Sequence, residues 1–233
     1  MKICMIHGSN RKGNTDRTVE LIKKSLDRLD QMEYTDIFLP KDLPHFCSGC
    51  FACLRTGERA GENCPHKQYT HPILNALLEA DGFVIASPVY AMAETAQIKS
   101  LFDHFACIYL AHRPYEEMFD KVVFIATTTA GGGTGYVNRV VDRNMRFWGI
   151  KRTVKFQAAL HAMNWDEMNA DRRSKIERRL EQTTNKFYRL TKKRRQLSSR
   201  LSVNLLRFVF RRLILTYADT EPDKIYWKSK GWI

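Results

Sequence analysis

The chain has 233 residues, of which 44% are hydrophobic and 27% are charged, a balance typical of one α/β domain with an extension. No run of about 20 apolar residues is present, so the sequence does not predict a membrane-spanning helix. Because strand-forming residues begin at once, no signal peptide is expected, and the six cysteines are expected to be reduced in the cytoplasm.

The net charge of +13 is distributed unevenly along the chain. Residues 171–233 contain 18 Lys and Arg against 6 Asp and Glu, whereas the residues before them are nearly neutral. The basic character therefore belongs to the C-terminal region. We divide the chain into a domain of residues 1–165 and a basic helical extension of residues 166–233.

The first strand and the loop after it are the most informative stretch. Residues 3–6 are apolar, Gly8 ends the strand, and a Ser-Asn-Arg-Lys-Gly-Asn-Thr loop leads into a helix near residue 15. A strand-to-helix turn directs backbone N–H groups and a helix N-terminus toward one spot, which suits a phosphate. The spacing matches neither the Walker loop nor G-x-G-x-x-G. An ordinary capped helix start is the alternative interpretation.

Strand and helix patterns then alternate along the domain. Strands are predicted at 34–39, 82–87, 121–127 and 151–158, and helices at 15–29, 71–80, 94–109 and 136–147. The helix at 71–80 has a proline, Pro72, in its first turn. Alternation of this kind implies an α/β fold with a parallel sheet, and right-handed crossovers give the doubly wound order 2-1-3-4-5. A ligand is then expected beyond the first, third and fourth strands, where loops 9–15, 88–92 and 128–136 lie.

The extension contains two further helix patterns, at 166–195 and 200–217, and an aromatic tail at 221–233 that is predicted to be extended. In the second helix one polar stripe is formed by Arg200, Asn204, Arg207 and Arg211. The apolar residues of 199–217 could pack on a second subunit or lie on an anionic membrane surface. Nucleic-acid binding is not expected, because no recognition motif accompanies the charge.

Four cysteines occur in the long loop after the second strand: Cys47, Cys50, Cys53 and Cys64. Their C-x2-C-x2-C start and later Cys-Pro resemble the ferredoxin run, so a [4Fe–4S] cluster is one interpretation. Reduced cysteines that pack the loop are another, and zinc is a third, although zinc sites usually pair two C-x2-C knuckles. Cys4 and Cys107 lie in apolar patterns and are predicted to be core residues.

Three segments taken together resemble one family. GSNRKGNT at 8–15, ASPVYAMAETAQIKSLFDH at 86–104 and TTTAGGGTGY at 127–136 resemble the flavodoxin-like NAD(P)H-dependent FMN reductases, and in particular the iron–sulfur flavoproteins. The resemblance implies that the FMN phosphate is held by Ser9, Arg11, Asn14 and Thr15. It implies that the ribityl chain and ring edge meet Pro88, Val89, Tyr90, Ala91 and Met92. It places the ring system over Thr129, Gly131, Gly132 and Gly133, with Tyr136 nearby.

The resemblance also implies an activity. An NAD(P)H oxidoreductase would pass hydride from its substrate NAD(P)H through FMN to a small acceptor such as a flavin, quinone or nitro compound. No catalytic acid–base residue is expected, because the flavin supplies the chemistry. His7, His45, His104 and His112 are accordingly left unassigned.

An iron–sulfur flavoprotein that transfers single electrons to a redox partner protein is the alternative activity. The ten residues between Cys53 and Cys64 exceed the compact motif of that branch. Members of the family are commonly homodimers or higher homo-oligomers, which favours a subunit contact for residues 199–217.

Overall fold

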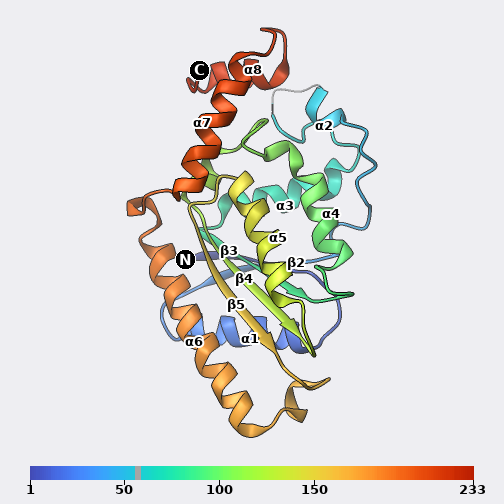
Figure 1. The fold of residues 1–233 in the computed structure, drawn as a ribbon, viewed down its shortest axis with the longest axis vertical. Coiled ribbons are helices and arrows are strands. Elements are labelled where there is room, and N and C mark those ends of the chain that lie inside the picture. Colours follow the sequence, from blue (N-terminus) through green and yellow to red (C-terminus); the bar gives the residue numbers. More distant parts are fainter. Residues whose placement is uncertain (56–58) are drawn as a thin grey trace.

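The computed structural model describes residues 1–55 and 59–233, which form a parallel sheet covered by helices on both faces (Figure 1). Within these residues the five strands are β1 (Lys2–His7), β2 (Glu33–Phe38), β3 (Gly82–Pro88), β4 (Val122–Thr129) and β5 (Arg152–Ala159). The helices are α1 (Asn14–Asp27), α2 (Ala52–Arg55), α3 (Lys67–Glu79), α4 (Ala96–His104), α5 (Thr134–Phe147), α6 (Ala170–Lys192), α7 (Leu201–Leu215) and α8 (Pro222–Ser229). The strand order is β2-β1-β3-β4-β5, which confirms the predicted flavodoxin-like fold.

Each central strand contributes to two hydrophobic cores, one on either side of the sheet. In β1, Ile3 and Met5 pack with α1 and α6, whereas Cys4 and Ile6 pack with α3, α4 and α5. Because both faces are covered, β1, β3 and β4 are buried at nearly every position, and each contains a run of at least four consecutive apolar residues. This continuous apolar pattern is the reason that the strands could be predicted from the sequence.

Helix α6 belongs to the layers of the sheet, although we assigned it to the extension. Ile176, Leu180 and Phe187 of α6 lie in the same core as the buried residues of α1. Helices α7 and α8 project past the end of the sheet at which the strands begin (Figure 1). The sheet domain in the structure therefore includes residues beyond the predicted boundary at 165.

The aromatic tail is helical, and the prediction that it is extended is wrong. Pro222 begins α8, where its missing N–H costs no hydrogen bond. The Tyr226 hydroxyl donates to the Pro114 carbonyl (2.6 Å), and Trp227 Nε1 donates to the His112 carbonyl (2.7 Å). These contacts with a distant segment stabilise α8, and a local sequence pattern does not reveal them.

Two other helices differ from their predicted extent. Helix α3 begins at Lys67, so Pro72 lies inside the helix and not in its first turn. Helix α4 ends at His104, because the chain continues as a 3₁₀ turn over Ala106–Ile108. Across the described residues, no helix has both the length and the apolar composition required to cross a bilayer.

Candidate functional site

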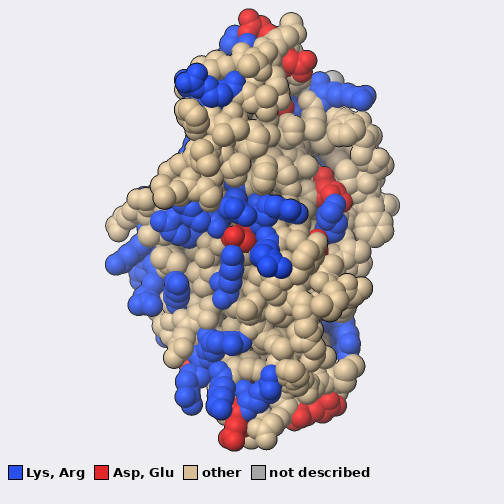
Figure 2. Space-filling view, viewed as in Figure 1, with Lys and Arg blue, Asp and Glu red and all other residues tan. Residues whose placement is uncertain are grey.

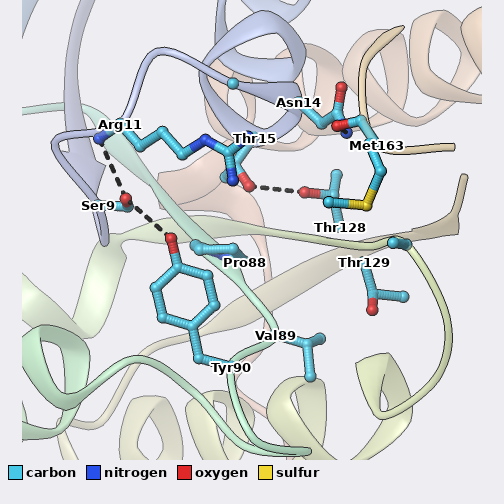
Figure 3. A pocket seen from close by; sticks show the side chains of 12 residues that line it. Ser9, Arg11, Asn14, Thr15, Pro88, Val89, Tyr90, Thr128, Thr129 and Met163 are labelled. Carbon is cyan, nitrogen blue, oxygen red and sulfur yellow. Dashed lines mark hydrogen bonds between the residues drawn. The ribbon is translucent and has the colours of Figure 1, made fainter. Parts of the chain in front are cut away.

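A cavity of about 150 Å³ lies where β1, β3 and β4 end (Figure 3). Parallel strands end at the same edge of a sheet, and the strand order reverses between β1 and β3, which is where this fold class binds ligands. The predicted residues that line the cavity are Ser9, Arg11, Asn14, Thr15, Pro88, Val89, Tyr90 and Thr129. Eight of the residues predicted to bind FMN therefore line one cavity, and their role in binding it stays a prediction.

The first turn of α1 forms one side of the cavity. Gly13, Asn14 and Thr15 line it, and within the described residues no side chain caps this helix. The N-terminus of a 14-residue helix carries a partial positive charge, to which the guanidinium of Arg11 adds a full one. This side of the cavity favours an anionic group such as a phosphate.

Hydrogen bonds join the loops around the cavity (Figure 3). The backbone N–H of Arg11 donates to Ser9 Oγ (3.1 Å), and Ser9 Oγ lies 3.3 Å from the Tyr90 hydroxyl. On the opposite side, Thr15 Oγ1 lies 2.6 Å from Thr128 Oγ1. The ends of β1, β3 and β4 are thereby held together around one space.

Close backbone approach explains the glycine that ends β1. A Cβ atom on Gly8 would lie 2.7 Å from Ile98 Cγ1 and 2.9 Å from the Ala86 carbonyl oxygen. The Gly8 carbonyl accepts a hydrogen bond from the buried Thr95 hydroxyl (2.7 Å), which also accepts from Ile98 N at the start of α4. The loop after β1 is therefore fixed against both β3 and α4.

The loop after β3 has an unusual backbone. Tyr90 and Ala93 exchange two backbone hydrogen bonds of 3.0 Å across a turn in which Ala91 and Met92 have φ angles of 47° and 65°. Non-glycine residues seldom adopt this left-handed region, and such strain is concentrated at binding sites. The turn presents the Tyr90 ring to the cavity.

The remaining predicted residues lie beside the cavity and not on its wall. They are Ala91, Met92, Gly131, Gly132, Gly133 and Tyr136. A Cβ atom on Gly133 would lie 2.8 Å from Val89 Cγ1 and 3.3 Å from Met92 Cα, so the β3 and β4 loops touch. Met92 and Tyr136 are both exposed, which leaves this rim open to solvent.

Four further residues line the wall: Gly13, Thr128 and Ala130, which lie in the predicted loops but were not singled out, and Met163, which lies outside them. Gly13, Thr128 and Ala130 adjoin predicted residues and could have been included with them. Met163 follows β5, and its carbonyl accepts a hydrogen bond from Asn14 Nδ2 (3.0 Å). No sequence signal places that segment beside the first loop.

Comparison with known proteins identifies the family of this chain. A sequence model of the NADPH-dependent FMN reductase family matches residues 1–156. The chain belongs to this family. An iron–sulfur flavoprotein of Archaeoglobus fulgidus is 30% identical over 156 residues, which cover 64% of this chain and 64% of that relative's length. A second, from Methanocaldococcus jannaschii, is 27% identical over 207 residues, covering 84% of this chain and 100% of the relative.

Solved structures share the fold at low sequence identity. An FMN-dependent NADH-azoreductase from Bacillus anthracis, solved in complex with FMN, superposes with a TM-score of 0.56 at 14% identity. The match covers 82% of this chain and 100% of the azoreductase chain. At this identity the comparison concerns the fold alone.

The residues present fit the phosphate end of FMN, the cofactor that the family implies. The uncapped start of α1, Arg11 and the hydroxyls of Ser9 and Thr15 meet at the cavity. Pockets that enclose whole ligands typically measure about 300–1,000 Å³, so a cavity of 150 Å³ encloses only part of FMN. The rim formed by the β3 and β4 loops lies outside this cavity and is open to solvent.

The cysteine loop does not form a closed ligand set in the part of the chain that the structure describes. Cys47, Cys53 and Cys64 are half-buried and Cys50 is exposed. Nowhere in residues 1–55 and 59–233 do three or more His, Cys, Asp or Glu side chains gather in a metal-binding group. In the described residues these side chains are therefore not arranged as a preformed metal site, although Cys47, Cys50 and Cys53 all lie near enough to Cys64 to help raise its pKa.

Cys53 and the buried Cys107 instead contact one another. A hydrogen bond from the Cys107 thiol lowers the pKa of Cys53 to about 6, and the same bond together with burial raises the pKa of Cys107. Burial also raises the pKa of Cys64. Cys4 is a core residue, as predicted, and burial raises its pKa to about 12.

The unassigned histidines have structural partners. His7 Nε2 lies 2.8 Å from Asp36 Oδ1, and His112 Nδ1 lies 2.8 Å from Asp223 Oδ2. His104 Nε2 lies 3.0 Å from a ring nitrogen of His66, whose ring stacks on that of His45. None of these rings lines the cavity at the strand ends, so they are not assigned to its chemistry.

Proposed function

We propose that this protein is an FMN-dependent NAD(P)H oxidoreductase that passes hydride from a nicotinamide through FMN to a small acceptor, such as a flavin, quinone or nitro compound. The observation that carries the proposal is the cavity at the ends of β1, β3 and β4, in a chain of the NADPH-dependent FMN reductase family. Six cysteines at uneven spacing, four of them clustered in one loop, are expected to be reduced, which supports a cytoplasmic location.

The chain's own residues bind and orient the cofactor in this proposal. Ser9, Arg11, Asn14 and Thr15 bind the phosphate together with the first backbone N–H groups of α1. The loops at 88–92 and 129–136 support the ring through their backbone, which Gly133 allows to approach closely. The flavin supplies the capacity to accept and release a hydride, so no side chain has to transfer a proton.

The proposal is tested by titrating the flavin-free protein with FMN and then measuring oxidation of NADPH with a quinone as the acceptor. Arg11→Gln removes a charged hydrogen-bond donor and should weaken FMN binding by about tenfold to a hundredfold. Lys12→Gln is the matched control, because Lys12 carries the same charge but does not line the cavity. Failure of the wild-type protein to bind FMN would refute the proposal.

Electron transfer through an iron–sulfur cluster to a partner protein is the second candidate. It is favoured by the cysteine spacing and by the names of the relatives, while the side-chain positions in the described cysteine loop do not support it. Iron and sulfide analysis of anaerobically purified protein tests this candidate. About four iron atoms per chain, lost in Cys50→Ser, would support it, whereas iron-free yellow protein would exclude it.

A further inference from the structure

Helix α7 turns large apolar side chains toward solvent. Leu201, Leu205 and Phe208 are 88%, 63% and 57% exposed. Val209, Leu213 and Leu215 are also exposed, whereas only Val203 and Ile214 of this helix are buried. A helix on a soluble surface normally has the opposite arrangement, with its apolar side against the protein.

The polar stripe predicted for this helix contacts the rest of the protein. Three of its members make the contacts: Arg200 donates to Asp142 of α5 (2.7 Å), Arg207 lies over the Phe119 ring (4.2 Å), and Arg211 Nε donates to the Trp232 carbonyl (2.8 Å). These polar contacts help to fix which side of α7 faces outward. The exposed leucines are therefore a consequence of how the helix is held.

The surface beside this apolar side is basic. Figure 2 shows Lys and Arg gathered over α5, β5 and α6, next to α7, with few acidic residues among them. Helix α5 contributes the exposed Arg139 and Arg143, and β5 contributes the exposed Lys155. Within α7 itself, the exposed Arg212 lies over the Phe208 ring (5.4 Å), so a positive charge stands among the exposed apolar groups.

Charge complementarity distinguishes the possible occupants of this surface. A second copy would bring a basic face against an identical basic face, and a chain of net charge +13 repels itself. An anionic lipid surface attracts the same arginines and accepts the apolar side chains at its headgroup boundary. The combination of exposed leucines with flanking arginines fits lipid better than it fits a second subunit.

We propose that the outward side of α7 binds the surface of an anionic lipid bilayer. Leu201, Leu205 and Phe208 enter the headgroup boundary, and Arg212 pairs with lipid phosphates. The flavin site lies at the opposite end of the sheet, so this inference is independent of the proposed reaction.

Co-sedimentation of the full-length holoprotein with vesicles tests the proposal. We expect binding to vesicles of about three parts phosphatidylcholine to one part phosphatidylglycerol, and weak binding to phosphatidylcholine alone. Arg212→Gln should weaken binding about fivefold, and the triple variant Leu201→Ser/Leu205→Ser/Phe208→Ser should weaken it by about tenfold or more. All of these side chains are exposed, so the variants should fold, which an unchanged circular dichroism spectrum and an unchanged Tm verify.

The single variant Leu205→Ser should also weaken vesicle binding, and Leu29→Ser is its control. It removes another exposed leucine, which follows α1 on the other face of the sheet, and it should leave vesicle binding unchanged. Wild-type protein that stays in the supernatant with anionic vesicles would overturn the proposal, as would equal binding to neutral vesicles. A dimer in analytical ultracentrifugation that Leu205→Ser converts to monomer, without vesicle binding by the wild type, would overturn it in favour of a second copy.

Discussion

Gly133 lies at the contact between the β3 and β4 loops, with a φ angle of 91°. In Gly133→Ala the new methyl group would meet Val89 at 2.8 Å, and alanine would have to adopt a left-handed backbone. Together these effects should cost about 1–3 kcal/mol and displace the loops that we propose to support the ring. We expect FMN affinity to fall about tenfold or more and the Tm to fall by several degrees, measured by flavin titration and thermal unfolding.

Gly135→Ala is the matched control two residues away. Nothing lies within 4 Å of a Cβ atom at this position, and Gly135 is already in the first turn of α5. Because alanine is favoured over glycine in helices, the protein should be as stable as the wild type or slightly more so. Equal effects of Gly133→Ala and Gly135→Ala on FMN affinity would contradict our prediction that the contact between the β3 and β4 loops at Gly133 is needed for FMN binding.

The sequence predicts the residues of the cavity only where they lie in one continuous loop at the end of a predicted strand. Ser9, Arg11 and Thr15 belong to one loop directly after a strand, and the topology alone identifies that loop as a ligand site. Met163 reaches the same cavity through a segment whose position depends on β5 packing at the edge of the sheet. Such a contact depends on tertiary structure, and neither composition nor spacing near Met163 encodes it.

At the scale of elements, Asp142 connects α5, β5 and the start of α7. Its Oδ1 accepts hydrogen bonds from Arg200 Nη1 (2.7 Å) and Thr153 Oγ1 (2.6 Å), and its Oδ2 pairs with Lys155 Nζ (3.0 Å). Asp142→Asn removes the charge that all three donors share. We expect a loss of about 1–3 kcal/mol in the free energy of unfolding and faster hydrogen exchange in α7, measured by urea unfolding and mass spectrometry.

The cost of Asp142→Asn should depend on pH. Burial by itself raises the pKa of Asp142, but the hydrogen bonds from Thr153 and Arg200 lower it overall. A carboxyl group with a lowered folded-state pKa stabilises fully above its unfolded pKa of about 3.9 and loses that contribution as pH falls through the folded value. The stability difference between wild type and variant should therefore be full at neutral pH and vanish in strong acid.

Asp103→Asn serves as the control for this element-scale prediction. Asp103 pairs with Lys99 on the exposed side of α4, where both side chains are largely in water. Such pairs contribute about 0.5 kcal/mol or less, with little dependence on burial. An equal loss in the free energy of unfolding for Asp103→Asn and Asp142→Asn would show that loss of a negative charge, and not loss of the specific contacts of Asp142, lowers the stability.

In the C-terminal extension, the sequence predicts a helix but not which side of the helix faces the protein. The periodicity of 200–217 identifies a helix and its stripes, and α7 confirms the helix. Periodicity does not say which stripe faces the protein, because that depends on partners such as Asp142 and Phe119 far away in the chain. In α8, two aromatic residues in succession resemble a strand, and only their contacts with residues 112–114 show otherwise.

At the scale of the whole molecule, ligand binding at the strand ends should stabilise the entire sheet domain. The cavity joins β1, β3 and β4, so a molecule bound there opposes separation of the central strands. FMN at about 100 times its Kd should add about 2.7 kcal/mol to the free energy of unfolding. For a chain of this size we expect the Tm to rise by about 5–10 °C, measured by circular dichroism during heating.

Riboflavin separates recognition of the phosphate from recognition of the ring, because it is FMN without its phosphate. The start of α1 and Arg11 would then lack an anionic partner in the cavity, and each lost charged hydrogen bond should raise the Kd about tenfold or more. At the same concentration, riboflavin should therefore raise the Tm by about half as much as FMN or less. Equal rises in Tm for the two ligands would mean that the loop after β1 does not bind the phosphate. If FMN raises the Tm of Arg11→Gln by as little as riboflavin raises that of the wild type, the stability of the sheet depends on phosphate binding at that loop.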